Sequence, residues 1–263
     1  PEGAGLRLFA VGAAVLALLL LAGRYLPDDV LDTWLVHKMG KWNEVNRIQA
    51  CAAYFRYFEK PSSGAIYYAK RVLTEDNPGE EIESLIGAGI ARGRTEQGAE
   101  VLLEAIRVRS GRSHLIEAFK TMGPEAVPAA CKAGERAYAG LAASGSGVES
   151  KRVMDAILPW LEENADPRSA EMLADICNKH VNLRSGCGPD VRAMAMRVLE
   201  RVLAVSASGV SDRALSSVRC GSPESRIVEM AKAETARRAA NPKPLRELPT
   251  EPEPPSPDQR HFL

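Results

Sequence analysis

Apolar residues recur every three or four positions along most of this chain, and a proline opens one periodic segment after another. Proline in the first turn of a helix forfeits no intrahelical hydrogen bond, and a Ser, Asp, Asn or Gly before it suits the N-cap. The pattern predicts helices that begin near the start of six segments: 60–73, 77–93, 123–140, 166–177, 188–203 and 222–240. We therefore expect an all-α protein.

The apolar residues inside these segments gather on one side of each predicted helix. In the segment 188–203, offsets of 0, 3, 7 and 8 place four of them on one face: Val191, Met194, Val198 and Leu199. A helix this short cannot bury such a face alone. Neighbouring helices must cover it, so we expect a helical-repeat domain over residues 61–240.

Three stretches resemble the inner-helix and outer-helix sequences of HEAT-type repeats: 122–133, 156–176 and 188–199. The stretch 92–107 is equally similar to the second helix of a tetratricopeptide-like hairpin. Either resemblance implies an α-solenoid of stacked helical hairpins. Such families are mostly scaffolds, because a stack of helices presents a long surface and fixes no particular chemistry.

Proline spacing supports a repeat. Pro128 and Pro159 stand 31 residues apart in similar apolar settings, and Pro189 and Pro223 stand 34 apart. These periods suit a solenoid. The Gly- and Ser-rich run 140–150 interrupts the pattern and is expected to be a loop or hinge.

The stretch 86–93, "IGAGIARG", imitates a dinucleotide-binding loop. A real loop of that kind follows a strand and opens a helix. Here Gly87, Gly89 and Gly93 fall within an amphipathic helical pattern. We therefore expect them to permit close helix packing.

Residues 8–23 form an uncharged run of 16 residues between Arg7 and Arg24. As a helix the run spans about 24 Å. The aliphatic stems of the two flanking arginines extend its apolar surface toward the roughly 30 Å of a hydrocarbon core. We expect an uncleaved transmembrane anchor over residues 1–26; a cleaved signal peptide and a buried helix of a soluble protein are the alternatives.

A juxtamembrane helical segment is expected to follow the anchor over residues 27–60. Trp34 and Trp42 lie in it, at a distance from the anchor where aromatic rings often sit at headgroup level. A buried helix contact explains both residues equally well. The whole pattern predicts a single-pass protein of a bacterial inner membrane or an equivalent membrane.

Charge adds one exclusion. Lys plus Arg and Asp plus Glu both total 34, so the chain has no global basic surplus of the kind that binds nucleic acid. Aromatic residues make up only 5% of the chain, which favours helices over sheets.

The five cysteines include no C-x-x-C pair, which removes the strongest metal and redox motifs. Cys177, His180, Cys187 and Cys220 remain as a conceivable zinc set. A disulfide among Cys177, Cys187 and Cys220 is a further candidate, and Cys187 to Cys220 is its favoured pair because each precedes a glycine and a proline-started helix. Free buried thiols are the slightly more favoured alternative.

Two opposed features of the sequence bear on the side of the membrane on which the helical domain lies. A disulfide requires an oxidising compartment, which favours an extracytoplasmic domain. A count of Lys and Arg around the anchor favours the cytoplasm instead. We expect the extracytoplasmic side.

After Ala240 the chain carries seven prolines in 23 residues. Such a sequence cannot continue a helix, so residues 241–263 are expected to form an extended, polyproline-like tail. The tail is predicted to dock on a neighbouring subunit through five residues: Pro252, Pro254, Pro255, Phe262 and Leu263.

These features predict a membrane-anchored scaffold or accessory subunit of a larger membrane protein complex. Its partners would be the other subunits of that complex and the lipid bilayer around residues 8–23, but not nucleic acid. We expect no catalytic activity and no cofactor, because the chain carries no catalytic motif. The alternatives are a membrane-anchored peptide or protein receptor and, less favoured, a metal-binding subunit that uses the four residues of the zinc set.

Overall fold

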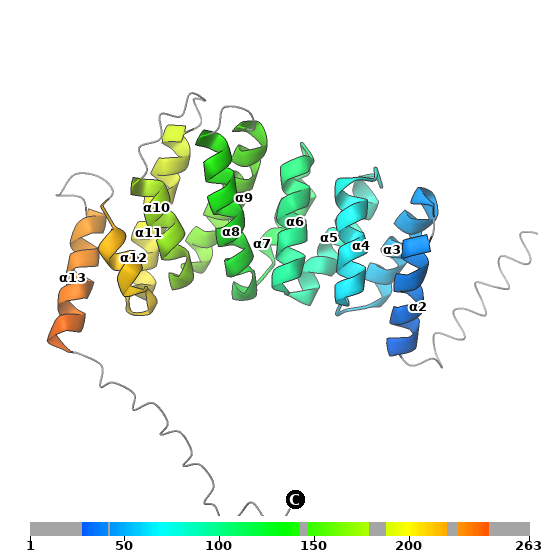
Figure 1. The fold of residues 1–263 in the computed structure, drawn as a ribbon, viewed down its shortest axis with the longest axis horizontal. Coiled ribbons are helices and arrows are strands. Elements are labelled where there is room, and N and C mark those ends of the chain that lie inside the picture. Colours follow the sequence, from blue (N-terminus) through cyan, green and yellow to red (C-terminus); the bar gives the residue numbers. More distant parts are fainter. Residues whose placement is uncertain (1–27, 42, 143–146, 179–187, 220–225, 242–263) are drawn as a thin grey trace, which may run out of the picture.

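The computed structural model describes residues 28–41, 43–142, 147–178, 188–219 and 226–241. All regular structure in these ranges is helical, which confirms the all-α prediction. The helices are α2 (Asp28–Lys41), α3 (Glu44–Tyr57), α4 (Ser63–Thr74), α5 (Glu80–Gly93), α6 (Glu96–Val108), α7 (Ser113–Lys120), α8 (Val127–Ala142), α9 (Gly147–Asn164), α10 (Ala170–Asn178), α11 (Gly188–Ser206), α12 (Asp212–Ser217) and α13 (Arg226–Ala240). They form an elongated row with α2 at one end and α13 at the other (Figure 1).

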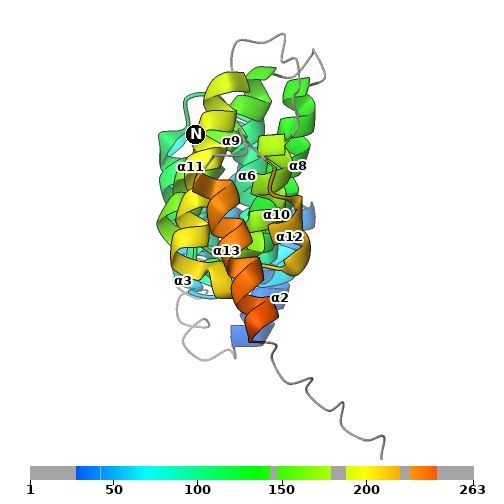
Figure 2. The ribbon, with the colours of Figure 1, turned by 90° about the vertical axis from the view of Figure 1, so that its left-hand side faces the viewer.

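The row has two layers. The even-numbered helices α2 to α12 pack side by side in one layer, and the odd-numbered helices α3 to α13 pack side by side in the other. Each even-numbered helix also packs on the odd-numbered helix that follows it. Figure 2, which looks along the row, shows α8, α10 and α12 on one side and α9 and α11 on the other. The packed helix pairs agree with the helical-repeat prediction, and α2 and α3 form the first pair of the same row.

The proline signals mark helix starts as the sequence predicts. Pro124 and Pro167 each occupy the first position of a short 3₁₀ turn that leads directly into α8 or α10. The Asp166 side chain caps the second of these turns by accepting a hydrogen bond of 2.9 Å from the backbone N–H of Arg168. The side chains of Ser62 and Thr95 cap α4 and α6 in the same way.

The repeat length changes along the row. The first residues of α2, α4, α6 and α8 lie 31 to 35 residues apart, whereas those of α8, α10 and α12 lie 42 to 43 apart. Pro128 lies in the first turn of α8 and Pro159 inside α9, which are the two helices of one pair. Their 31-residue separation is therefore not a repeat period, and that part of the sequence prediction is wrong.

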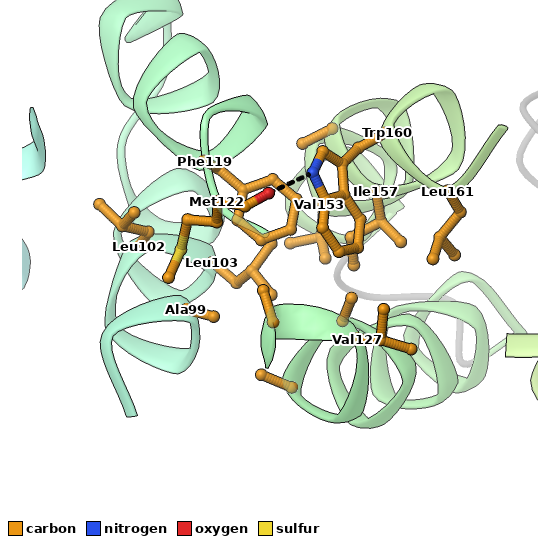
Figure 3. Packing of buried hydrophobic residues seen from close by; sticks show 14 of the residues in the cluster. Ala99, Leu102, Leu103, Phe119, Met122, Val127, Val153, Ile157, Trp160 and Leu161 are labelled. Carbon is orange, nitrogen blue, oxygen red and sulfur yellow. Dashed lines mark hydrogen bonds between the residues drawn. The ribbon is translucent and has the colours of Figure 1, made fainter. Parts of the chain in front are cut away.

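The core lies between the layers and runs through the described helices as one continuous cluster. At its centre Trp160 of α9 is fully buried, and its ring centroid lies 5.1 Å from that of Phe119 in α7. The indole Nε1 donates a hydrogen bond of 3.2 Å to the carbonyl of Met122 (Figure 3). The burial of a large ring without an unpaired donor stabilises the junction of α7, α8 and α9.

Close approach of α3 and α5 depends on a glycine. A Cβ atom on Gly89 would lie 2.6 Å from Cδ1 and 2.8 Å from Cβ of Phe55, a fully buried residue of α3. A Cβ atom on Gly93 would meet Pro61 at 2.8 Å. Gly89 therefore permits close helix packing, as predicted, and Gly93 leaves room for Pro61, which precedes α4.

One buried ion pair joins α3 to the turn after α4. Arg47 donates from Nη2 to Oδ1 of Asp76 over 2.6 Å and from Nε to Oδ2 over 3.0 Å. The two side chains are 9% and 6% exposed. Arg109, beyond the end of α6, donates to the carbonyls of Leu73 and Asp76. Two arginines thus hold this turn in place.

Candidate partner-binding groove

A groove of about 340 Å³ lies between α6 and α8 and is closed at one end by the first turns of α9. We call it the central groove. Its floor consists of small or apolar residues: Leu103, Ala129, Ala133, Ala137, Gly140 and Val153. Leu103 and Val153 belong to the core around Trp160 (Figure 3), so the floor is the outer surface of that core.

The sequence of α8 explains why space remains here. Ala129, Ala133, Ala137 and Gly140 recur at intervals of three or four residues and therefore lie on one side of the helix. These small side chains leave space on the floor beside α6, and the long side chains of Lys132 and Arg136 on the same helix also line the groove. On another side of α8, Gly134 approaches Met172 of α10 so closely that a Cβ atom would meet its sulfur.

Paired charges line the rim of the central groove. Nζ of Lys132 lies 2.7 Å from Oε1 of Glu96. Arg107 contacts Glu104 and, on α9, Glu149, each over 2.7 Å. The hydrogen bonds from Arg107 hold the pKa of the Glu104 carboxyl below its usual range. Exposed pairs of this kind each contribute about 0–1 kcal/mol, so a partner's charged groups can replace them at little cost.

A second, more open groove of about 610 Å³ lies between α3 and α5. Its apolar lining comes from five residues: Ala52, Ala53, Ile82, Leu85 and Ala88. Arg56 and Glu81 lie at its edges. The row therefore offers apolar grooves on both of its layers.

A buried acidic site lies between the first turns of α5 and α7. The fully buried Glu83 contacts Nε of Arg112 over 3.0 Å and Nε2 of His114 over 3.2 Å. Nδ1 of His114 lies 3.5 Å from Glu80. The Arg112 guanidinium and the His114 imidazole contact one carboxylate and join α5 to α7, which is a structural arrangement rather than a set of metal ligands.

Of the residues predicted for the anchor flanks, the disulfide and the docking tail, Trp34 is the one whose side chain the structure describes. It lies on α2, is 37% exposed, and has the Lys38 ammonium 5.7 Å from its ring centroid. Outside the described residues lie Arg7, Arg24, Trp42, Cys187, Cys220 and the tail residues Pro252, Pro254, Pro255, Phe262 and Leu263. Among the described helices, none combines the length and apolar composition needed to cross a bilayer. The anchor predicted over residues 1–26 lies outside this part of the chain.

The cysteine predictions also remain largely untested. Cys177 is buried in α10, whereas His180, Cys187 and Cys220 lie outside the described residues. Within the residues that the structure describes, no three His, Cys, Asp or Glu side chains converge as a metal site requires. Burial raises the pKa of the Cys131 thiol to about 12, so this cysteine is protonated and unreactive at neutral pH.

Sequence reasoning missed the central groove and the Glu83 site. The regular spacing of small residues in α8 was a visible signal for the first. The second joins residues 31 positions apart and has no local signal. Comparisons with family models, curated proteins and solved structures found no match to this chain.

Proposed function

We propose that this protein is a membrane-anchored, non-catalytic scaffold or accessory subunit that holds a segment of a partner protein in the central groove. The observation that carries the proposal is the combination of a small-residue floor with a rim of exchangeable ion pairs. Apolar side chains of a partner would contact the floor, and its charged groups would replace rim pairs. This is how grooves between helices commonly recognise peptides.

The repeat class is mixed in this proposal. The first residues of successive even-numbered helices lie 31 to 35 residues apart in the first half of the row, a spacing similar to that of tetratricopeptide repeats. In the second half they lie 42 to 43 residues apart, a spacing similar to that of HEAT repeats. Both classes build surfaces for protein partners. The mixture accounts for the similarity of different stretches to different families.

Placement in the cell rests on the sequence. The uncharged run 8–23 supports a single-pass anchor, and the matched contexts of Cys187 and Cys220 support a disulfide and an extracytoplasmic domain. The proline-rich tail 241–263 supports a second contact with a neighbouring subunit. The partners we propose are the other subunits of a membrane complex.

The test fills the groove without disturbing the fold. Ala133→Arg places a long cationic side chain on the groove floor, whereas Ala139→Arg places the same side chain on an exposed position of α8 outside the groove. Both variants are purified in mild detergent and compared for melting temperature and for the proteins that co-purify.

We expect both variants to melt like the unmodified chain and only Ala133→Arg to lose a partner that Ala139→Arg retains. If the two variants co-purify the same proteins in the same amounts, the central groove is not the binding site.

A further inference from the structure

The first helix of the row carries apolar residues on two sides. Met39 faces the core and is fully buried. On the other side Val30 is 47% exposed and Trp34 is 37% exposed, and Leu31 and Lys38 are half-buried beside them. We call these four residues the end face, because α2 is the helix at the end of the row (Figure 1).

The contacts of α2 fix the direction of the end face. A Cβ atom on Gly64 of α4 would lie 2.8 Å from Val36, so this side of α2 faces along the row. Asp32 accepts a hydrogen bond from Tyr54 of α3. At 100° per residue, Leu31, Trp34 and Lys38 fall on the side of the helix away from Val36. The end face therefore points out of the end of the row.

The chemistry of the end face fits a lipid headgroup layer. Trp34 presents an apolar ring with one polar N–H, and Lys38 carries its ammonium on an apolar stem beside that ring. Both types of side chain place apolar atoms toward lipid and polar atoms toward water. The sequence of α2 contains three Asp and two Lys, so attraction by anionic lipid is not required.

We propose that the end face lies in the headgroup layer of the membrane, a placement that rests on the proposed anchor at residues 8–23. Four residues, 24–27, separate that run from α2. The five Cα–Cα steps from residue 23 to residue 28, at about 3.5 Å each, span at most about 18 Å, which keeps the first turn of α2 close to the hydrocarbon edge. The row then stands away from the membrane, with α13 farthest from it.

Tryptophan quenching in vesicles tests the placement. The full chain is reconstituted in phosphatidylcholine vesicles with or without bromine on the upper part of the acyl chains. The variant Trp42→Phe retains Trp34 and the fully buried Trp160, and the double variant with Trp34→Phe retains only Trp160. The difference between them is the Trp34 emission. We expect brominated lipid to reduce it about twofold, because a headgroup-level ring lies beside the upper acyl chain.

The matched control adds Tyr67→Trp to the double variant. Tyr67 lies on α4 and is 63% exposed, but it is not part of the end face, so its replacement should not be quenched. If the chain floats with the vesicles while Trp34 is unquenched, or is quenched no more than the ring at position 67, the placement is wrong and the anchor stands. If the chain does not float with the vesicles, both the placement of the end face and the proposed anchor are wrong.

Discussion

Replacing Asp76 with Asn should destabilise the first half of the row through Arg47. The substitution keeps the size of the side chain but leaves the guanidinium of Arg47 beside a neutral amide. The Arg47 side chain is only 9% exposed in the ion pair. Breaking a buried pair in this way costs about 3–5 kcal/mol, because one charge remains buried and uncompensated. In a domain of this size, each kcal/mol of lost stability lowers the melting temperature by about 2–4 °C, so Asp76→Asn should lower it by roughly 6–20 °C.

The assay compares melting by circular dichroism with hydrogen exchange, both on the full chain in detergent. Because contacts in a row of repeats are local, exchange should rise in α3 and α5 before it rises in α11 or α13. The matched control is Glu75→Gln, which removes the neighbouring pair between Arg71 and Glu75. Those side chains are 48% and 62% exposed, so this loss should cost no more than about 0.5 kcal/mol.

A third variant separates charge burial from packing. Replacing Arg47 with Met and Asp76 with Leu together removes both charges, so most of the stability lost in Asp76→Asn should return. If Asp76→Asn costs no more than the Glu75→Gln control, the pair is not buried in solution and the reasoning fails.

Two further predictions concern the core and a thiol. Gly89→Ala should lower the free energy of unfolding by roughly 1–3 kcal/mol, because the added Cβ overpacks against Phe55. Gly87→Ala should be tolerated, because the nearest neighbour of its Cβ is the movable tip of Leu115 at 3.1 Å. Equal chemical-denaturation midpoints for the two variants would contradict this prediction. Burial raises the pKa of the Cys131 thiol to about 12, so this thiol should be alkylated slowly up to pH 9 in the native chain and readily after denaturation. Mass spectrometry of the labelled peptides measures the rate. Rapid labelling of the native chain at pH 8 would show that the thiol is not buried.

Features with a local cause were predictable from sequence. Pro124 and Pro167 mark helix starts because the constraint on the backbone lies within one turn. Arg47 and Asp76 were not predictable as a pair, since 29 residues separate them and only the packing of α3 beside the turn after α4 brings them together. The repeat period was misjudged at Pro159 because a proline inside α9 resembles one that begins a helix.

The candidate site shows the same limit. The small residues of α8 could be recognised in sequence, but a groove exists only because α6 lies beside them. The sequence left two interpretations of Trp34 open, a ring at headgroup level and a buried helix contact, and the structure adds its exposure and its contact with Lys38. The anchor, the disulfide and the docking tail lie outside the described residues and stay predictions.

The restriction of packing to neighbouring helices has a mechanical consequence. A tension applied between the first and last helices passes through every interface in series, so the displacements of the individual interfaces add while the weakest one sets the force at which the row opens. Under load the row should therefore stretch as a compliant spring, because each interface between neighbouring helices contributes its own displacement.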